Sequence, residues 1–233
     1  MLKTFVKLTN LKYIYLNIFG IALNFIEYLK YRINNNLPGE EAQKAMAPSI
    51  NSAPYRNFKP MDNAKASAVL IILFPDSVQN NYKILLTLRS KSISHSGQIS
   101  FPGGRVEANE SNTETALREA NEEIGLIADG LEIIGELSTL YVPPSNNIIT
   151  PVLAYSESAP VVGTINTEEV QEIIITDIHA LLNEDNLKKE MWTLGDREVE
   201  VPHWTIHETP LWGATAMLLS ELLNIYKELT NQN

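Results

Sequence analysis

The pattern of hydrophobic and polar positions separates an N-terminal segment from the rest of the chain. Apolar residues recur at steps of three and four over Leu11–Leu29, which predicts the apolar face of an amphipathic helix. The helix should end near Asn34–Asn36, because the helix breaker Pro38 follows. We therefore predict a helical extension over residues 1–36 and a tether of mixed polarity over residues 37–64.

The remaining segment, residues 65–233, alternates short apolar runs with polar turns, which is typical of strands in a packed sheet. The polar stretch Pro75–Asn81 predicts a turn that joins the first two strands as an antiparallel pair. The predicted strands are Ala68–Phe74, Ile84–Leu88, Leu131–Leu137 and Ile148–Tyr155, and the predicted helices are Thr113–Ile124, Asp177–Leu182 and Ala214–Leu229. Strands mixed irregularly with a few helices predict an α/β or α+β sandwich, not a doubly wound nucleotide fold.

Composition narrows the chemistry of this domain. A length of 233 residues suits one catalytic domain, and a formal net charge of -10 argues against a protein that binds nucleic acid through its overall charge. The absence of cysteine excludes disulfides, a thiolate nucleophile and cysteine-bound zinc, and four histidines are too few for a histidine-rich metal centre. Metal sites built from oxygen ligands remain open.

The apolar run Tyr13–Ile26 raises the question of a membrane or targeting segment. Asn17, Gly20 and Asn24 interrupt the run, no small-residue cleavage site follows it, and it is too short to span a bilayer. We therefore favour a packed or interfacial helix, in a cytoplasmic protein. Contact with a membrane surface or with a partner subunit, such as the second chain of a homodimer, is the alternative.

The helix predicted after residue 112 carries three acidic side chains on one face. Ser111 and Glu114 have the spacing of a capping box, which places the start of the helix. Glu119, Glu122 and Glu123 then lie three or four residues apart or side by side, so their like charges destabilise the helix unless a cation binds among them. Carboxylates suit Mg²⁺ or Mn²⁺. A solvated acidic face is the alternative for such a helix taken alone.

The residues around these glutamates form a longer pattern between residues 104 and 126. Its fixed positions are Gly104, Glu110, Arg118, Glu119, Ala120, Glu122, Glu123, Gly125 and Leu126. This spacing resembles the Nudix box, the motif of the Nudix hydrolase family. The resemblance implies the Nudix fold, a mixed β-sheet between helices, and metal-dependent hydrolysis of a diphosphate bond.

The resemblance also implies roles for individual residues. Glu119 and Glu123 are the expected metal ligands, and Glu122 is a third ligand with a catalytic role. The small Gly104 would let the backbone approach the metal and phosphate. Arg118, one turn before Glu122, can hold the carboxylates by hydrogen bonds.

The general base of such an enzyme lies within the box or on a loop elsewhere. Downstream candidates are Glu168, Glu169 and Glu172, of which we select Glu169, and for each the alternative is an ordinary surface glutamate. Glu110 is expected to be a helper or a structural partner.

A second motif stands just before the box, in Leu85–Ser90, His95–Gln98 and Phe101–Gly104. It resembles the additional motif of the coenzyme A pyrophosphatase branch of the Nudix family. The resemblance implies that the substrate is coenzyme A or one of its thioesters, cleaved to 3′,5′-ADP and 4′-phosphopantetheine or its acyl form. Ser94 stands where this branch has a basic residue, so the phosphate contact there is not assigned.

Five residues of this second motif are candidates for binding the substrate. They are Thr87, Arg89, Ser90, His95 and Gln98. Arg89 is the leading candidate for a phosphate, because a guanidinium can bind phosphate through two hydrogen bonds; Lys91 and Arg105 are weaker candidates. An ion pair between Arg89 and a box glutamate is the alternative, and His95 could instead be a structural histidine.

Two other functions remain open for a Nudix domain. The first is a different small-molecule substrate, such as ADP-ribose, a dinucleotide polyphosphate or an oxidised nucleoside triphosphate. The second is a non-catalytic ligand sensor, although the complete box and the lack of a DNA-binding module disfavour it.

Overall fold

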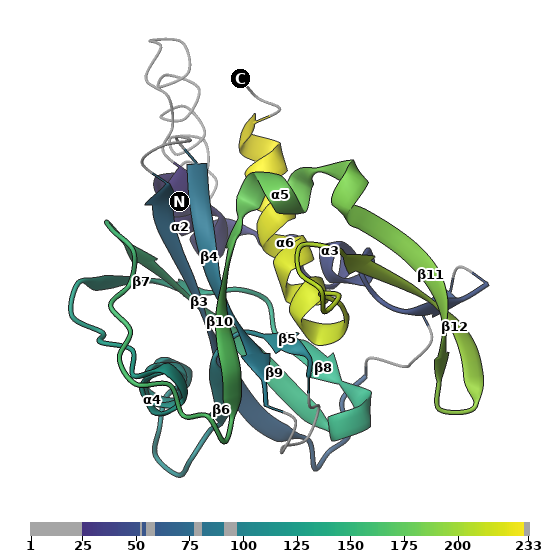
Figure 1. Ribbon diagram of the computed structural model, residues 1–233, viewed down its shortest axis with the longest axis horizontal. Coiled ribbons are helices and arrows are strands. Elements are labelled where there is room, and N and C mark those ends of the chain that lie inside the picture. The colour runs from purple at the N-terminus through teal and green to yellow at the C-terminus, as the bar shows by residue number, and fades with distance from the viewer. Residues whose placement is uncertain (1–24, 52, 55–58, 77–80, 91–96, 231–233) are drawn as a thin grey trace, which may run out of the picture.

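The structure is a computed structural model that describes residues 25–51, 53–54, 59–76, 81–90 and 97–230 (Figure 1). Most of the predicted N-terminal helix, residues 1–24, lies outside the described residues, as do the 77–80 part of the predicted turn and His95. Helix α2, Phe25–Asn35, ends where the sequence predicts. Its residues Phe25, Ile26 and Leu29 are buried in the main core, as expected of a packed helix.

The larger sheet is mixed, as the family resemblance implies. Its main strands lie in the order β10-β4-β3-β9-β7, with β5 added to β4, β6 to β3 and β8 to β9. Strands β3 and β9 are parallel, whereas β3 and β4 form the predicted antiparallel pair. The bounds are β3 Lys65–Asp76, β4 Asn81–Arg89, β5 Ile99–Ser100, β6 Gly103–Arg105, β7 Leu131–Glu136, β8 Leu140–Val142, β9 Asn147–Ser156 and β10 Val170–Asp177. All four predicted strands are confirmed.

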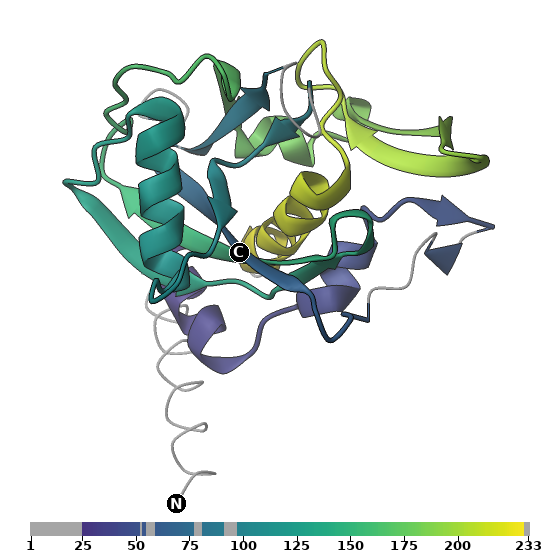
Figure 2. The ribbon, with the colours of Figure 1, turned by 90° about the horizontal axis from the view of Figure 1, so that it is seen from below.

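The central strand β3 explains why helices cover both faces of this sheet. Because successive side chains of a strand point to opposite faces, its unbroken apolar run must be buried on both. Leu70 and Ile72 pack with helix α4, and Ile71 and Leu73 pack with α2 and α6. Figure 2 shows α4 and α6 on the two sides of the sheet. The three predicted helices are present as α4 Asn112–Ile124, α5 Ile178–Leu182 and α6 Gly213–Thr230.

A second, smaller sheet was not predicted. It has the strand order β11-β12-β1-β2, with bounds β11 Leu187–Leu194, β12 Arg197–Trp204, β1 Ser49–Ile50 and β2 Ala53–Pro54. The sequence does carry a signal for its hairpin: Gly195 adopts a φ of 69° in the tight turn, and Val199 and Val201 alternate with polar residues in β12. Short 3₁₀ turns at Pro143–Ser145 and Glu184–Asn186 complete the connections.

The predicted tether over residues 37–64 is wrong for its first part. Residues Gly39–Lys44 form helix α3, which packs against α6. The Gly39 amide donates to the fully buried carboxylate of Glu221 at 3.0 Å, and Gln43 Nε2 donates to the same carboxylate at 3.1 Å and to the Ser138 carbonyl at 3.0 Å. Polar groups of α3 therefore satisfy a buried carboxylate inside the fold, and the polar composition of this segment does not reveal that role. No helix of the described residues is long and apolar enough to cross a membrane.

Candidate active site

The carboxylate helix α4 is fixed at both ends by the residues that the sequence singles out. Ser111 Oγ accepts a hydrogen bond from the Glu114 amide at 3.2 Å, and the Glu114 carboxylate accepts one from the Ser111 amide at 2.8 Å, which confirms the capping box. At the other end Gly125 has φ 61° and ψ 31°, the left-handed conformation of a glycine cap. A Cβ on Gly125 would lie 2.9 Å from the Cα of Gly163 in a neighbouring loop, so only glycine fits.

Two glycines bring strand β6 close to the carboxylates of α4. A Cβ on Gly104 would lie 2.3 Å from the carboxyl carbon of Glu119, and one on Gly103 would lie 2.4 Å from the carbonyl oxygen of Ala68. The Gly103 amide donates to the Glu123 carboxylate at 3.3 Å. Gly104 therefore makes room for the Glu119 head group, whereas Gly103 lets β6 lie close to β3 and its amide contacts Glu123.

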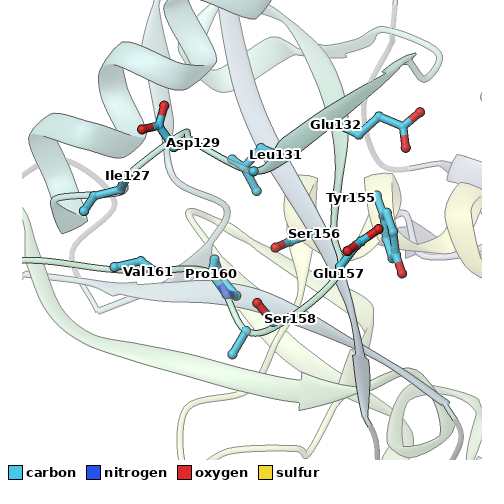
Figure 3. A pocket seen from close by; sticks show the side chains of 12 residues that line it. Ile127, Asp129, Leu131, Glu132, Tyr155, Ser156, Glu157, Ser158, Pro160 and Val161 are labelled. Carbon is cyan, nitrogen blue, oxygen red and sulfur yellow. The ribbon is translucent and has the colours of Figure 1, made fainter.

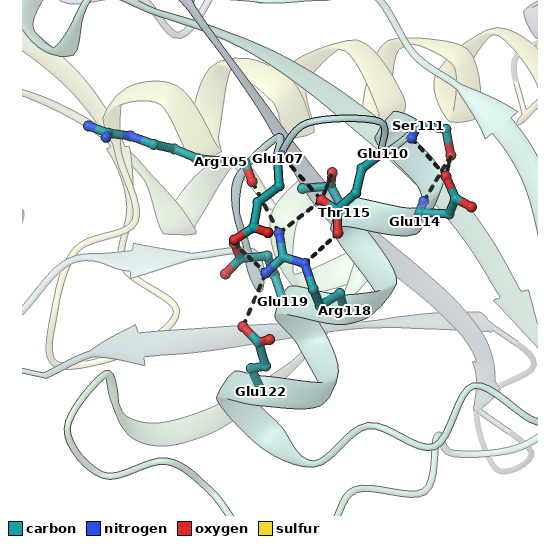
Figure 4. Close-up of polar contacts among 9 residues, drawn as sticks. All are labelled: Arg105, Glu107, Glu110, Ser111, Glu114, Thr115, Arg118, Glu119 and Glu122. Atoms are coloured by element: carbon teal, nitrogen blue, oxygen red, sulfur yellow. Dashed lines mark hydrogen bonds and ion pairs between the residues drawn. The ribbon is translucent and has the colours of Figure 1, made fainter.

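Arg118 connects three of the box glutamates (Figure 4). Its Nε and Nη2 donate to the two oxygens of Glu110 at 2.7 and 3.0 Å. Its Nη1 donates to Glu119 at 3.0 Å and to Glu122 at 3.1 Å, and Nη2 also reaches the Arg105 carbonyl at 3.2 Å. All five N–H donors of this guanidinium thus have a partner, so the side chain is held in one orientation. Arg118 therefore lies among the carboxylates and bonds to them.

The glutamates of the box differ in their electrostatic state. Hydrogen bonds from Arg118 and then Thr115 lower the pKa of Glu110 to about 2. Burial raises the pKa of Glu123 to about 7, against the opposing effects of Arg89 and of the Gly103 amide, and the nearby Glu169 and Glu119 raise it further. Burial also raises the pKa of Glu119, although Arg118 lowers it. Ionising both inner carboxylates is therefore unfavourable without added positive charge.

The loop before β10 brings Glu169 to this cluster. The Asn166 amide donates to the carbonyl of Glu123 at 2.9 Å, and Asn166 Nδ2 donates to the Glu169 carboxylate at 3.1 Å. The charge of Glu169 raises the pKa of both Glu119 and Glu123. Of the three downstream candidates, Glu169 thus lies near the inner carboxylates, and Asn166, which sequence reasoning missed, orients it.

The expected metal ligands are not arranged around one point. Within the part of the chain that the structure describes, no three acidic or histidine side chains form a ready-made cation site. Glu122, the expected third ligand, has 55% of its side chain exposed and is paired with Arg118. The two inner glutamates still offer what a hard cation requires, namely oxygen donors that repel one another in a buried position.

The residues of the upstream motif separate into those that face this cluster and those that do not. Arg89 Nη1 lies 3.8 Å from Glu123 Oε1, which is the ion pair considered as its alternative role. The Ser90 amide donates to the backbone carbonyl of Glu169 at 2.8 Å. The Arg89 amide donates to the backbone carbonyl of Gln98 at 3.0 Å, and the Gln98 residue is partly exposed. Thr87 requires a correction: it is 1% exposed and its hydroxyl bonds to Ser100, because position 87 pairs with β5, so it is not available to a substrate.

Two cavities lie outside the carboxylate cluster. One, of about 450 Å³, lies beyond the C-terminal end of α4, beside β7 and the end of β9 (Figure 3). Ile127, Leu131 and Val161 line it together with acidic residues, and it contains none of the predicted site residues. The other, of about 700 Å³, lies beside the end of β4 and includes Leu88 and Gly97, which both belong to the upstream motif.

Comparison with known proteins identifies the family. The model of the NUDIX domain matches residues 64–197, and the chain belongs to the Nudix family of hydrolases. Nudix hydrolase 3 of Caenorhabditis elegans is 30% identical over 205 residues, which cover 80% of this chain and 85% of that protein. With a complete box in a matched domain, the chain is a pyrophosphohydrolase, as the sequence predicts.

Other relatives carry more particular names. The mitochondrial coenzyme A diphosphatase NUDT8 of Homo sapiens is 29% identical over 72% of this chain and 72% of its own length. An uncharacterized Nudix hydrolase NudL of Citrobacter koseri is 31% identical over 69% of this chain and 82% of its own length. Among solved structures, the Nudix hydrolase RenU of M. smegmatis aligns with a TM-score of 0.48 at 15% identity, covering 76% of this chain and 96% of that one.

Proposed function

We propose that this enzyme hydrolyses the diphosphate bond of coenzyme A or its thioesters, yielding 3′,5′-ADP and 4′-phosphopantetheine or its acyl form. The observation that carries the proposal is the 3.8 Å approach of Arg89 to Glu123, because it joins the upstream motif to the box at one point. A relative named for coenzyme A diphosphatase activity, similar over 72% of this chain, supports the same substrate.

The carboxylate oxygens of Glu119 and Glu123 are suitable ligands for Mg²⁺ or Mn²⁺. Magnesium is typically bound by one or two carboxylates, completed by water and by phosphate oxygens of the substrate. The raised pKa of Glu123, caused first by burial, indicates a carboxylate whose ionised form needs a cation nearby. When bound, such ions neutralise diphosphate charge and make water more acidic.

The side chains around the pair would have distinct tasks. Glu169, oriented by Asn166, would accept the proton of the attacking water. Arg89 would turn from Glu123 to a phosphate oxygen, where its guanidinium can form paired hydrogen bonds. Arg118 is a positioning residue, because its donors are already used by Glu110, Glu119, Glu122 and Arg105.

The direct test is to incubate the purified protein with coenzyme A and Mg²⁺ or Mn²⁺ and to separate the products by chromatography. We expect 3′,5′-ADP to form, its formation to stop with a chelator, and Glu119→Gln to abolish it. Glu184→Gln, which changes an exposed glutamate of the second 3₁₀ turn, is the matched control and should keep the wild-type rate.

Competing substrates make the same assay decisive. Coenzyme A, ADP-ribose and a dinucleotide polyphosphate are offered at equal concentration. Preferred turnover of either competitor, with no 3′,5′-ADP from coenzyme A, would overturn the substrate assignment while leaving the pyrophosphohydrolase in place.

A further inference from the structure

The 700 Å³ cavity beside β4 is lined mainly by polar residues. Leu88, its residue on β4, packs in the core cluster on the face of the sheet opposite the carboxylate helix α4. The lining residues of the cavity belong to the end of β4, the start of β10 and the loop 205–212 that joins β12 to α6. Figure 1 shows the strands and the helix that bound these segments. Side chains from these separate segments meet in it, among them Leu88, Gln171, Glu172, His207 and Thr209. None of the roles proposed above uses this cavity.

His207 is held in one orientation within the wall. Its Nδ1 accepts a hydrogen bond from the Thr209 amide at 3.0 Å, which leaves the proton of the neutral ring on Nε2. Nε2 lies 3.1 Å from Glu172 Oε1, so the ring donates to that carboxylate. The two side chains remain 24% and 45% exposed, so the Glu172 oxygens are fixed in place yet open to a ligand.

The cavity adjoins the reaction centre along two paired strands. Leu88 on β4 is opposite Glu172 on β10, and the following residue Arg89 is opposite Val170. Successive side chains of a strand point to opposite faces, so Leu88 and Arg89 face opposite sides of the strand end. Because Arg89 approaches Glu123, a molecule bound at the carboxylates can reach the cavity by passing over the end of β4.

The charges of the cavity select against a phosphate. Glu172 and Glu208 both line it, and no lysine or arginine does so among the described residues. Two carboxylates repel an anion and accept hydrogen bonds from N–H and O–H groups, whereas Gln171 and the hydroxyl of Thr209 can donate to carbonyl oxygens. Leu88 adds apolar surface. This combination fits an uncharged chain that contains amides, hydroxyl and methyl groups.

We propose that this cavity binds the pantetheine arm of the substrate, leaving the phosphorylated adenosine half outside it. The inference rests on the function proposed above. Coenzyme A has one anionic half, with its 3′-phosphate, and one neutral half, with amides, a hydroxyl and a geminal dimethyl group. The pair Glu172–His207 is then a specificity determinant for the neutral half.

Glu172→Gln and His207→Leu test the assignment through a split between kcat and KM. Losing one hydrogen bond to the arm should raise the KM for coenzyme A about 3- to 10-fold and change kcat by less than about 2-fold. Inhibition by the product 4′-phosphopantetheine should weaken by the same factor, whereas inhibition by 3′,5′-ADP should be unchanged. That unchanged inhibition also shows that the variants are folded.

A second histidine–glutamate pair in the chain provides a matched control. His203 Nε2 lies 3.8 Å from Glu190 Oε2 on the β11–β12 hairpin, outside the residues of the cavity. Glu190→Gln should leave kcat, KM and both product inhibitions as in the wild type. A loss of 4′-phosphopantetheine inhibition in this variant would overturn the assignment to Glu172 and His207.

The outcomes separate this inference from the proposed function. If the wild type releases no 3′,5′-ADP from coenzyme A, the proposed function fails first, and the cavity assignment falls with it. If the wild type cleaves coenzyme A and both variants keep its KM, only the cavity assignment is wrong. If the variants lose inhibition by 3′,5′-ADP instead, the nucleotide half lies in the cavity, which also overturns the assignment.

Discussion

The ionised form of a glutamate is stabilised at one end of the box glutamate cluster and destabilised at the other. At the outer end Glu110 receives hydrogen bonds from Arg118 and Thr115, and these lower its pKa to about 2. At the inner end Glu123 is 2% exposed, its nearest guanidinium is 3.8 Å away, and burial raises its pKa to about 7. The same residue type is thus stabilised as an anion at one end and destabilised at the other.

This difference separates residues that hold the fold from residues that bind. Glu110 is satisfied by the chain itself, so it contributes to the folded state with no ligand. Glu123 is incompletely satisfied, so its ionised form favours the binding of a cation over the stability of the free protein. Unfavourable local electrostatics of this kind are common at functional sites.

The largest effect is expected for Glu123→Gln, which should lower kcat at least about 100-fold because it removes a charged ligand at the reaction centre. The same change should stabilise the metal-free protein at pH 8. The folded-state pKa of Glu123 is raised from 4.5 to about 7, so its stabilising contribution is complete below pH 4.5 and is lost as the pH rises through 7.

Thermal unfolding of the metal-free wild type and variant at pH 5 and pH 8 measures this trade-off. The neutral amide avoids the cost of a buried anion, a difference on the order of 2 kcal/mol at pH 8 that should shrink toward pH 5. A variant that is less stable than the wild type at pH 8 would show that the inner carboxylate is satisfied by the chain after all.

The opposite pH dependence is expected for Glu110→Gln. The pKa of Glu110 is lowered from 4.5 to about 2, so its contribution is complete above pH 4.5 and is lost as the pH falls toward 2. The denaturant midpoint of the variant should lie below that of the wild type at pH 7, and the gap should narrow between pH 4.5 and pH 3. A gap that stays constant with pH would remove the electrostatic explanation.

The smallest effect is expected for Ser111→Ala, which removes the N-cap of α4. Loss of this cap should cost about 1 kcal/mol of stability and leave the activity of the folded enzyme unchanged, because the Ser111 side chain forms its hydrogen bonds with Glu114 and not with the inner carboxylates. Ser158→Ala, in an exposed loop, is the control and should change neither quantity. A large fall in kcat would mean that the cap also positions the inner carboxylates.

Local patterns predict the parts of this molecule that local interactions form. The capping box of Ser111 and Glu114 is set within a few residues of sequence, and it is confirmed. The glycine cap that the structure shows at Gly125 is equally local. Long apolar runs likewise predict β3 and β9, since only a buried central strand tolerates them.

Features that depend on distant partners could not be predicted in this way. Thr87 looks like a donor for substrate until β5 is placed beside it and Ser100 takes its hydroxyl. Helix α3 looks like a polar tether because the buried Glu221 that it satisfies lies 182 residues from Gly39. Asn166 precedes Glu169 by three residues, and this spacing could have indicated a contact between the two side chains. The hydrogen bond from the Asn166 amide to the Glu123 carbonyl, however, exists only in the folded chain.

The central claim is that the inner carboxylates of α4 bind the catalytic cation. The most direct test is a titration with Mn²⁺ of the wild type, Glu123→Gln and the control Glu184→Gln, in which electron paramagnetic resonance measures the bound and free Mn²⁺. We expect the wild type and the control to bind Mn²⁺ with the same affinity and Glu123→Gln to bind it at least about 10-fold more weakly. Equal Mn²⁺ affinity in all three proteins would contradict the account.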